Sequence, residues 1–254
     1  MLRLAAPSLV LALTLGLACD TGTAGPARVR IGHFIPDAPA IDVCLKPTGT
    51  SAFSGKFVQQ GGLNFGSVSA RSSVDAGTYS LRIVSAGAAD CNTSLGGLGD
   101  VNLVPIDGDT AITVGLAGLL SGSGSTQVLA ENFVDDAAAP ASPGVKLRFL
   151  HLSPELGPVD VGTLSGNTFS KLNPAVSLSY TGSSSYVGYA NPLTDTLALL
   201  DSGTANLRLQ GGFSVGAGTV SSVYIIGRPN QTSGDPRLSF LVCSDTTSSC
   251  VRSP

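Results

Sequence analysis

The stretch RVRIGHFIPDAPAIDV at residues 28–43 decides the fold, because the chain repeats its pattern as KLRFLHLSPELGPVDV at residues 146–161. The two copies contain the only two histidines of the 254-residue chain. A repeat of this length predicts two modules built on one fold. The matched positions are Arg30 with Arg148, His33 with His151, Pro36 with Pro154, Asp42 with Asp160, and Val43 with Val161.

Each copy predicts a strand, a short loop containing proline, and a second strand. Apolar residues alternate with charged ones around Arg30 and Arg148, as the period of two in a strand requires. If the two strands of a copy pair with each other, Arg30 lies opposite Asp42 and Arg148 lies opposite Asp160. Such cross-strand ion pairs contribute about 0.2–1 kcal/mol. The motif is therefore expected to serve folding, with its charges facing outward.

The two histidines leave three interpretations open. Each could lie at the rim of the core and hydrogen-bond to its loop, ligate a metal, or act as an acid or base beside an aspartate. Strand alternation places His33 and Asp42 on opposite faces of the sheet, which disfavours the catalytic pair. One histidine in each of two modules is also a poor metal site. The structural role is the prediction.

The composition predicts an all-β chain. Thirty-two glycines, 15 prolines and only 12% charged residues are typical of short strands joined by turns. The strand spacing predicts two tandem immunoglobulin-like β-sandwiches at residues 28–133 and 145–254, with a barrel as the alternative. Between them, VDDAAAPASPG at residues 134–144 reads as a linker. A second match, residues 74–82 with 200–208, implies about eight extra residues in the second copy, assigned to residues 180–191.

The N-terminal 18 residues read as a signal peptide, with one positive charge at Arg3 before an apolar run too short to span a membrane. The sequence LGLAC ending at Cys19 resembles the lipobox of a bacterial lipoprotein, although Gly16 stands where leucine is usual. The resemblance implies fatty acylation of Cys19, with palmitate among the acyl chains, and a short tether over residues 19–27. Ordinary secretory cleavage after Ala18 or Ala24 is the alternative.

The remaining cysteines are four, Cys44, Cys91, Cys243 and Cys250, and they can pair in three ways. Only Cys44 with Cys91 and Cys243 with Cys250 keep both bridges inside a module, so this pairing is expected. The chain has no CxxC motif and no histidine near these residues, which disfavours metal binding. Disulfides predict an oxidising, extracytoplasmic location, with the membrane reached through the lipid.

The signature R-x-x-H-x-x-P-x-x-x-x-x-D-V, followed by a D-x-G-T-Y-x-L-R segment, resembles the bacterial family called domain of unknown function 4397. The first copy carries HFIPDAPAIDV at residues 33–43, and the second carries HLSPELGPVDV at residues 151–161. The resemblance implies secreted or surface-attached β-domains, often in tandem, with no established activity. It transfers no functional residue.

No sequence motif indicates an enzyme or a cofactor. GFSVG at residues 212–216 matches a nucleophile elbow, but no histidine follows residue 151, so a glycine-rich turn is expected. IDGDT at residues 106–110 lacks the other ligands of a calcium loop and reads as a hairpin turn. A net charge of −3 without a basic cluster argues against nucleic-acid binding.

Two classes of function remain. The first is a non-catalytic envelope or surface protein that binds an unknown protein or glycan, or has a structural role. The second is an extracytoplasmic hydrolase or a carbohydrate-binding protein on a β-scaffold. The chain has no tryptophan, and its only clustered aromatic candidates for a partner contact are Tyr180, Tyr186 and Tyr189. The missing cluster of acid, base and nucleophile favours the first class.

Overall fold

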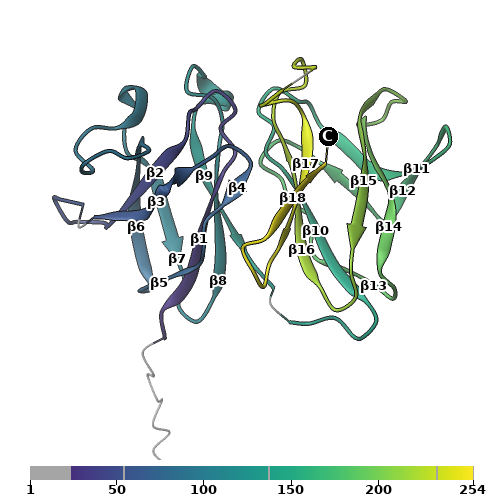
Figure 1. Ribbon diagram of the computed structural model, residues 1–254, viewed down its shortest axis with the longest axis horizontal. Coiled ribbons are helices and arrows are strands. Elements are labelled where there is room, and N and C mark those ends of the chain that lie inside the picture. The colour runs from purple at the N-terminus through teal and green to yellow at the C-terminus, as the bar shows by residue number, and fades with distance from the viewer. Residues whose placement is uncertain (1–23, 54, 137, 233, 254) are drawn as a thin grey trace, which may run out of the picture.

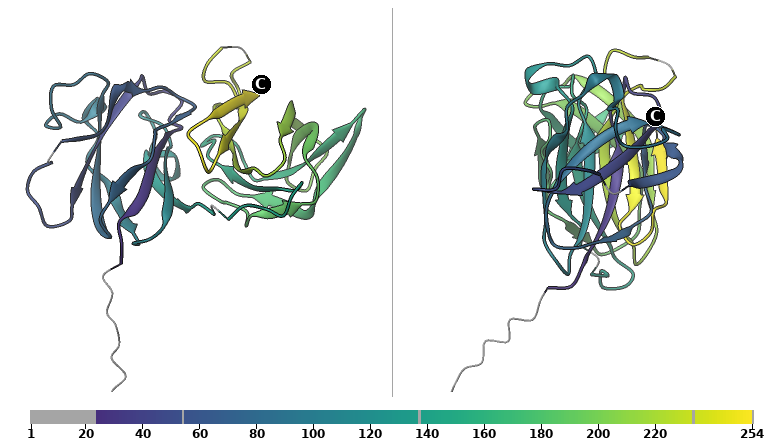
Figure 2. Two further views of the ribbon diagram at one scale, coloured as in Figure 1. Left: turned by 60° about the horizontal axis from the view of Figure 1, so that its bottom comes forward. Right: turned by 90° about the vertical axis from the view of Figure 1, so that its left-hand side faces the viewer.

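The computed structural model describes residues 24–253 except 54, 137 and 233. Four β-sheets form two sandwich-like halves that lie side by side (Figures 1 and 2). The chain crosses from the first half to the second between the strands that end at Val134 and begin at Val145, within the predicted linker. Cys19 and the signal segment lie outside the described residues.

The first half consists of two β-sheets packed against each other. One contains, in spatial order, β4 (Ser67–Val68), β1 (Ala27–His33), β8 (Ala111–Ala117) and β9 (Leu129–Val134), and β5 (Ser72–Val74) also pairs with β1. The other contains β3 (Lys56–Leu63), β2 (Ile41–Pro47), β6 (Gly77–Ser85) and β7 (Val101–Ile106). Two 3₁₀ turns, η1 (Leu95–Gly97) and η2 (Gly124–Thr126), lie in its loops.

The second half repeats this strand order. One sheet contains β13 (Val187–Tyr189), β10 (Val145–His151), β16 (Val220–Ile226), β17 (Ser239–Ser244) and β18 (Cys250–Ser253). The other contains β12 (Thr168–Leu178), β11 (Val159–Ser165), β14 (Leu193–Asp201) and β15 (Leu207–Val215). The first strand of each half runs parallel to a later one, β1 to β8 and β10 to β16. In the described part of the chain no helix is long and apolar enough to cross a bilayer.

Each half has its own apolar core, and a third apolar cluster joins the halves. Val29 and Ile31 enter the first core, and Leu147 and Phe149 enter the second. The joining cluster takes Phe34 and Phe133 from the first half and Tyr224 and Leu241 from the second. The sheets that contain β1 and β10 are therefore covered on both faces, which explains why every residue of β16 is buried.

The predicted cross-strand pairs are wrong. β1 and β2 lie in different sheets of the sandwich, because the proline loop carries the chain from one sheet to the other. β10 and β11 are separated in the same way. Arg30 and Asp42 therefore never lie opposite each other, and neither do Arg148 and Asp160. Arg30 is fully buried, not outward-facing, because the second half covers its side of the sheet.

The second sequence match is also not structurally equivalent. Gly77 begins β6, whereas Gly203 follows the end of β14. Ile41 pairs with Ser85 and its counterpart Val159 pairs with Asp201, so Ser85, not Asp75, corresponds to Asp201. The two short segments resemble each other because both are glycine turns at strand ends. The inferred gain of about eight residues is wrong for that reason.

The residues assigned to the insert are ordinary parts of the repeated fold. β5 pairs with β1 and β13 pairs with β10 in the same register, Val29 with Ser72 and Leu147 with Val187. The Ser69 hydroxyl accepts the Ile31 amide hydrogen, and the Ser184 hydroxyl accepts that of Phe149. Residues 180–189 are thus the counterpart of residues 65–74.

Candidate functional site

The interface between the two halves is the most distinctive feature of the molecule. β1, β8 and β9 of the first half face β10, β16 and β17 of the second (Figure 1). The rings of Phe34 and Tyr224 stack with their centroids 4.8 Å apart. Gly115 leaves room here, since a Cβ at this position would lie 3.1 Å from Phe133 and 3.2 Å from Leu152. The two faces are therefore in close contact at these residues.

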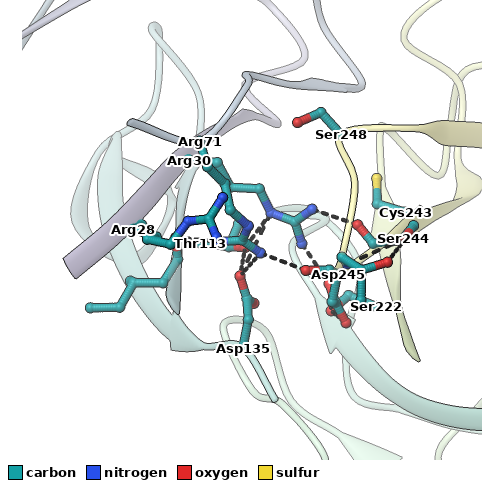
Figure 3. Close-up of polar contacts among 12 residues, drawn as sticks. Arg28, Arg30, Arg71, Thr113, Asp135, Ser222, Cys243, Ser244, Asp245 and Ser248 are labelled. Atoms are coloured by element: carbon teal, nitrogen blue, oxygen red, sulfur yellow. Dashed lines mark hydrogen bonds and ion pairs between the residues drawn. The ribbon is translucent and has the colours of Figure 1, made fainter. Parts of the chain in front are cut away.

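Arg30 extends from β1 into the second half. Its Nε donates to the Thr113 hydroxyl of its own half at 2.7 Å. Its Nη1 donates to the Ser244 carbonyl at 2.7 Å, and its Nη2 donates to the Asp245 carboxylate at 2.5 Å (Figure 3). The guanidinium is therefore satisfied mainly by groups at the end of β17 and just beyond it.

Arg148 makes the reciprocal set of contacts. Its Nε donates to the Ser222 hydroxyl of its own half at 2.7 Å, and its Nη1 donates to the Val134 carbonyl of the other half at 2.7 Å. Its Nη2 donates to the Asp135 carboxylate. Asp135 follows β9 as Asp245 follows β17, and their amides donate to the equivalent carbonyls of Ala111 and Val220. The halves are thus related by an approximate twofold exchange of arginines.

Equivalent positions beside this exchange hold different residues. Arg71, which precedes β5, donates to the Asp135 carboxylate at 2.5 Å and to the Asp245 carbonyl at 3.0 Å (Figure 3). Tyr186, which precedes β13, donates its hydroxyl to Asp245 at 2.8 Å and places its ring 4.8 Å from the Arg148 guanidinium carbon. Both side chains donate to Asp245, Arg71 as a cation to its carbonyl and Tyr186 as a neutral donor to its carboxylate.

Burial sets the electrostatics of this network, which we call the interface network: Arg30, Arg71, Thr113, Asp135, Arg148, Tyr186, Ser222 and Asp245. Burial by itself lowers the pKa of Arg30, but Tyr224 and the two aspartates raise it above its ordinary value. Burial raises the pKa of Asp245, against the lowering effect of Arg148. Removing one partner would leave a buried charge uncompensated. The network therefore makes each half dependent on the other.

Both histidines are buried in one tautomer that ties down their loops. His33 Nδ1 accepts the Ile35 amide hydrogen at 3.3 Å, so Nε2 carries the proton and donates to the Pro39 carbonyl at 3.1 Å. His151 repeats this with Ser153 and Gly157. Burial lowers the pKa of His33 to about 4 and also lowers that of His151. The described residues contain no group of three or more histidine, cysteine, aspartate or glutamate side chains suited to hold a metal ion.

The aspartates of the repeat also hold loops. Asp42 accepts from Lys56 at 2.8 Å and from the Gly87 amide at 3.0 Å. Asp160 accepts from Lys171, Ser177 and the Gly203 amide. Burial alone would raise the pKa of Asp160, but these donors lower it to about 2. Pro36 and Pro154 are buried in the loops beside the histidines.

The structure joins Cys44 to Cys91 and Cys243 to Cys250, the expected pairing. The first bridge ties β2 to the loop after β6, and the second ties β17 to β18. Neither bridge has a counterpart in the other half.

The three clustered tyrosines do not form an exposed platform. Tyr180 packs edge-on against His151, with ring centroids 6.1 Å apart, as Phe65 packs against His33. Tyr186 lies in the interface network, and Tyr189 packs against the second core. The hydroxyl oxygens of Tyr180 and Tyr189 are buried. A partner contact through these rings stays a prediction that their inward placement does not favour.

The interface network was not predicted from the sequence, although two features of the sequence indicate it. The face that carries the arginine continues without charge, as Gly32 and Phe34 in one repeat and as Leu150 and Leu152 in the other, which indicates a strand covered on both faces. An aspartate also stands directly after the last long strand of each half, in FVD at residues 133–135 and CSD at residues 243–245. The sequence does not show which aspartate each arginine contacts, because that depends on how the two modules are placed relative to each other.

Comparison with known proteins now places the chain. The model of a family described as "Domain of unknown function (DUF4397)" matches residues 27–162, more than half of the sequence. The chain belongs to the DUF4397 family. The match covers the first half and continues through β10 into β11. No curated protein sequence matches this DUF4397 chain.

Three solved structures are remotely similar to this DUF4397 protein. A leucine-rich repeat protein from Bacteroides thetaiotaomicron is 13% identical with a TM-score of 0.23, and the match covers 83% of this chain but only 27% of that protein. A candidate adhesin from Bacteroides ovatus is 9% identical, with a TM-score of 0.19 and coverage of 87% and 96%. The fimbrial anchor protein Mfa2 from Porphyromonas gingivalis is 8% identical, with a TM-score of 0.19 and coverage of 90% and 100%. At these TM-scores the likenesses carry no argument about function.

Proposed function

We propose that this protein is a non-catalytic cell-envelope lipoprotein whose two tandem β-sandwiches form one rigid body with a binding or structural role. One observation carries the proposal. Among the described residues, the polar side chains that recur in both halves hold the halves together or hold loops, and none of them converges on an open site. Two buried arginines, each bonded to the opposite half, make a stiff unit in place of two modules on a hinge.

The location is part of the same proposal. The two disulfides support an oxidising compartment. Acylation of Cys19, which lies outside the described residues, would attach the rigid unit to a membrane through the tether at residues 19–27. The classification of each half as immunoglobulin-like also stays a prediction, and it rests on strand number and spacing. The hydrolase alternative gains no support, since both imidazoles are buried and bonded to their own loops.

Metabolic labelling tests the anchor. Cells expressing the protein or Cys19→Ala are grown with radiolabelled palmitate and fractionated. The unaltered protein is expected to carry label and to sediment with membranes, whereas the variant is expected to lose both. Label-free protein in a soluble extracytoplasmic fraction would show ordinary secretion and remove the lipoprotein part of the proposal.

A pull-down and a glycan array test the binding role. The folded protein, purified from its own compartment, is presented to envelope extracts and to the array, beside the same protein reduced and unfolded. A partner retained only by the folded protein supports a binding role. Hydrolysis of a panel of ester, peptide and glycoside substrates that is abolished by His33→Gln or His151→Gln would contradict the non-catalytic assignment.

A further inference from the structure

The approximate twofold relation between the halves shows a place where one carboxylate is missing. In the second half, Lys146 at the start of β10 donates to the Asp136 carboxylate at 2.6 Å. Asp136 follows Asp135, one residue beyond the interface network. The strand registers make Arg28 the counterpart of Lys146, because Arg28 pairs with Ala111 as Lys146 pairs with Val220. The counterpart of Asp136 is the residue after Asp245.

That residue is Thr246, which has no charge to offer. Its hydroxyl instead lies 3.0 Å from the Ser244 hydroxyl. The Arg28 side chain is exposed and has no hydrogen bond or ion pair to any residue that the structure describes. Lys146 thus has Asp136 as its acidic partner on one side of the interface. Arg28, the equivalent cation on the other side, has no acidic partner in the described part of the chain.

A cavity occupies this position. Its volume is about 700 Å³, and its lining includes Arg28, Arg71, Asp109 and Thr246. The Asp109 carboxylate accepts the Gly25 amide hydrogen at 3.0 Å, which ties it to the first described residues of the chain. Arg71 reaches the cavity from the interface network. The space lies where the first half, the second half and the start of the described chain meet.

The charges around the cavity do not balance. The interface network and the cavity lining together contain four guanidinium groups and three carboxylates among the described residues. The cations are Arg28, Arg30, Arg71 and Arg148, and the acids are Asp109, Asp135 and Asp245. The excess of one positive charge lies partly in a buried region, where the effective dielectric constant is low and an unbalanced charge is costly. A single bound anion would restore the balance found around Lys146.

We propose that this cavity binds one oxyanion group, a carboxylate or a phosphate, between Arg28 and Thr246. Arg28 would hold the anion with charge-assisted hydrogen bonds, in the place that Asp136 takes beside Lys146. The Thr246 hydroxyl can donate a further hydrogen bond. The group could belong to a soluble metabolite or to a lipid headgroup, and both sources present the same chemistry.

Calorimetric titration of the purified protein with acetate and with inorganic phosphate, at constant ionic strength set by chloride, tests the site. At least one anion is expected to bind saturably with one site per chain. Arg28→Ala should weaken binding about tenfold or more, because it removes the charged donor. Arg208→Ala removes an arginine that pairs with Asp201 far from the cavity, and it should leave binding unchanged. No saturable binding, or binding that Arg28→Ala does not weaken, overturns the proposal.

The two halves also provide a matched pair of exchanges. Thr246→Asp builds the missing carboxylate into the first site, so it should abolish anion binding and raise the melting temperature in the absence of added anion. Asp136→Thr opens the equivalent place beside Lys146, so it should raise the stoichiometry from one anion to two. If Thr246→Asp leaves anion affinity intact, the anion binds elsewhere and the proposal fails.

Sedimentation with vesicles separates the two sources of the group. The Cys19→Ser protein, which has no acyl anchor, is mixed with phosphatidylglycerol vesicles or with phosphatidylcholine vesicles as the neutral control. Binding to the first that is lost in Arg28→Ala and in Thr246→Asp assigns a lipid headgroup. Saturable binding of free phosphate without vesicle binding assigns a soluble anion. Vesicle binding that both substitutions leave intact counts against the site.

Discussion

The two halves of the molecule have the same strand order and exchange the same arginines, yet several equivalent positions at their interface hold different residues. Gly115 and Arg71 of the first half correspond to Tyr224 and Tyr186 of the second half. Asp136 of the first half corresponds to Thr246 of the second half. The shared residues hold the halves together, because each buried guanidinium needs the other half's aspartate. The differing residues make the pairing specific, because a tyrosine at position 115 would press against Phe133 and Leu152, whereas Tyr224 stacks on Phe34.

The largest expected effect on stability comes from replacing the two buried arginines that the halves share. Arg30→Met and Arg148→Met each remove the arginine that a buried aspartate pairs with across the interface, so each should lower the free energy of unfolding by about 3–5 kcal/mol. Urea denaturation measures this, with a substitution at the exposed Arg208, Arg208→Met, as control. Equal costs for the two arginines would sharpen the twofold equivalence. A cost below about 1 kcal/mol for either would show that the exchange does not stabilise the interface.

The disulfides provide the next contrast, since each half has one and they close loops of different length. The Cys44–Cys91 bridge spans 47 residues and the Cys243–Cys250 bridge spans 7. Loop entropy predicts losses of about 4 and about 2.5 kcal/mol when each pair is replaced by serine. Thermal and urea unfolding of the two double variants test this. If the short loop proves the costlier to open, the lost chain entropy is not the main source of the stability that these bridges provide.

The two equivalent histidines make the stability of each half depend on pH. Because the pKa of His33 is lowered from 6.5 to about 4, the unfolded chain takes up the proton first as the pH falls. The contribution of His33 is therefore complete above pH 6.5 and is lost between pH 6.5 and 4, by roughly 3 kcal/mol. His33→Gln should flatten this part of the profile, and His151→Gln should act in the same direction. Proton NMR titration of His33 near its unfolded value would contradict the assignment.

The smallest expected effect on stability comes from Tyr224, one of the residues that differ between the halves. The Tyr224 hydroxyl is buried without a hydrogen-bond partner in the described structure, while its ring stacks on Phe34. Tyr224→Phe should therefore change the free energy of unfolding by no more than about 0.5 kcal/mol, or raise it slightly, because no hydrogen bond is lost. Tyr224→Leu, which loses the stacking, is the comparison. A loss above about 1 kcal/mol in Tyr224→Phe would reveal a bond to the hydroxyl.

Particular residues show how far sequence reasoning reaches in this protein. The spacing of Arg30, His33, Pro36 and Asp42 and its return after residue 145 indicated an all-β chain with two similar halves. The pairing of Arg30 with Asp42 failed because a strand, a loop and a strand can form a hairpin or can cross between two sheets, and local alternation is the same in both. The glycine turns at Gly77 and Gly203 misled for a related reason, since turn chemistry repeats at many strand ends.

Local patterns therefore determined that the chain is built of β-strands, which cysteines lie in the same half, and that Arg30 and Arg148 occupy equivalent places. These properties depend on neighbours along the chain and on a period of two. Only the tertiary structure decided that each arginine meets the opposite half's aspartate, and that Arg28 has no acid where Lys146 has one. The arginine–aspartate contacts join residues up to 215 positions apart, and their energies depend on burial that exists only after the two halves have packed together.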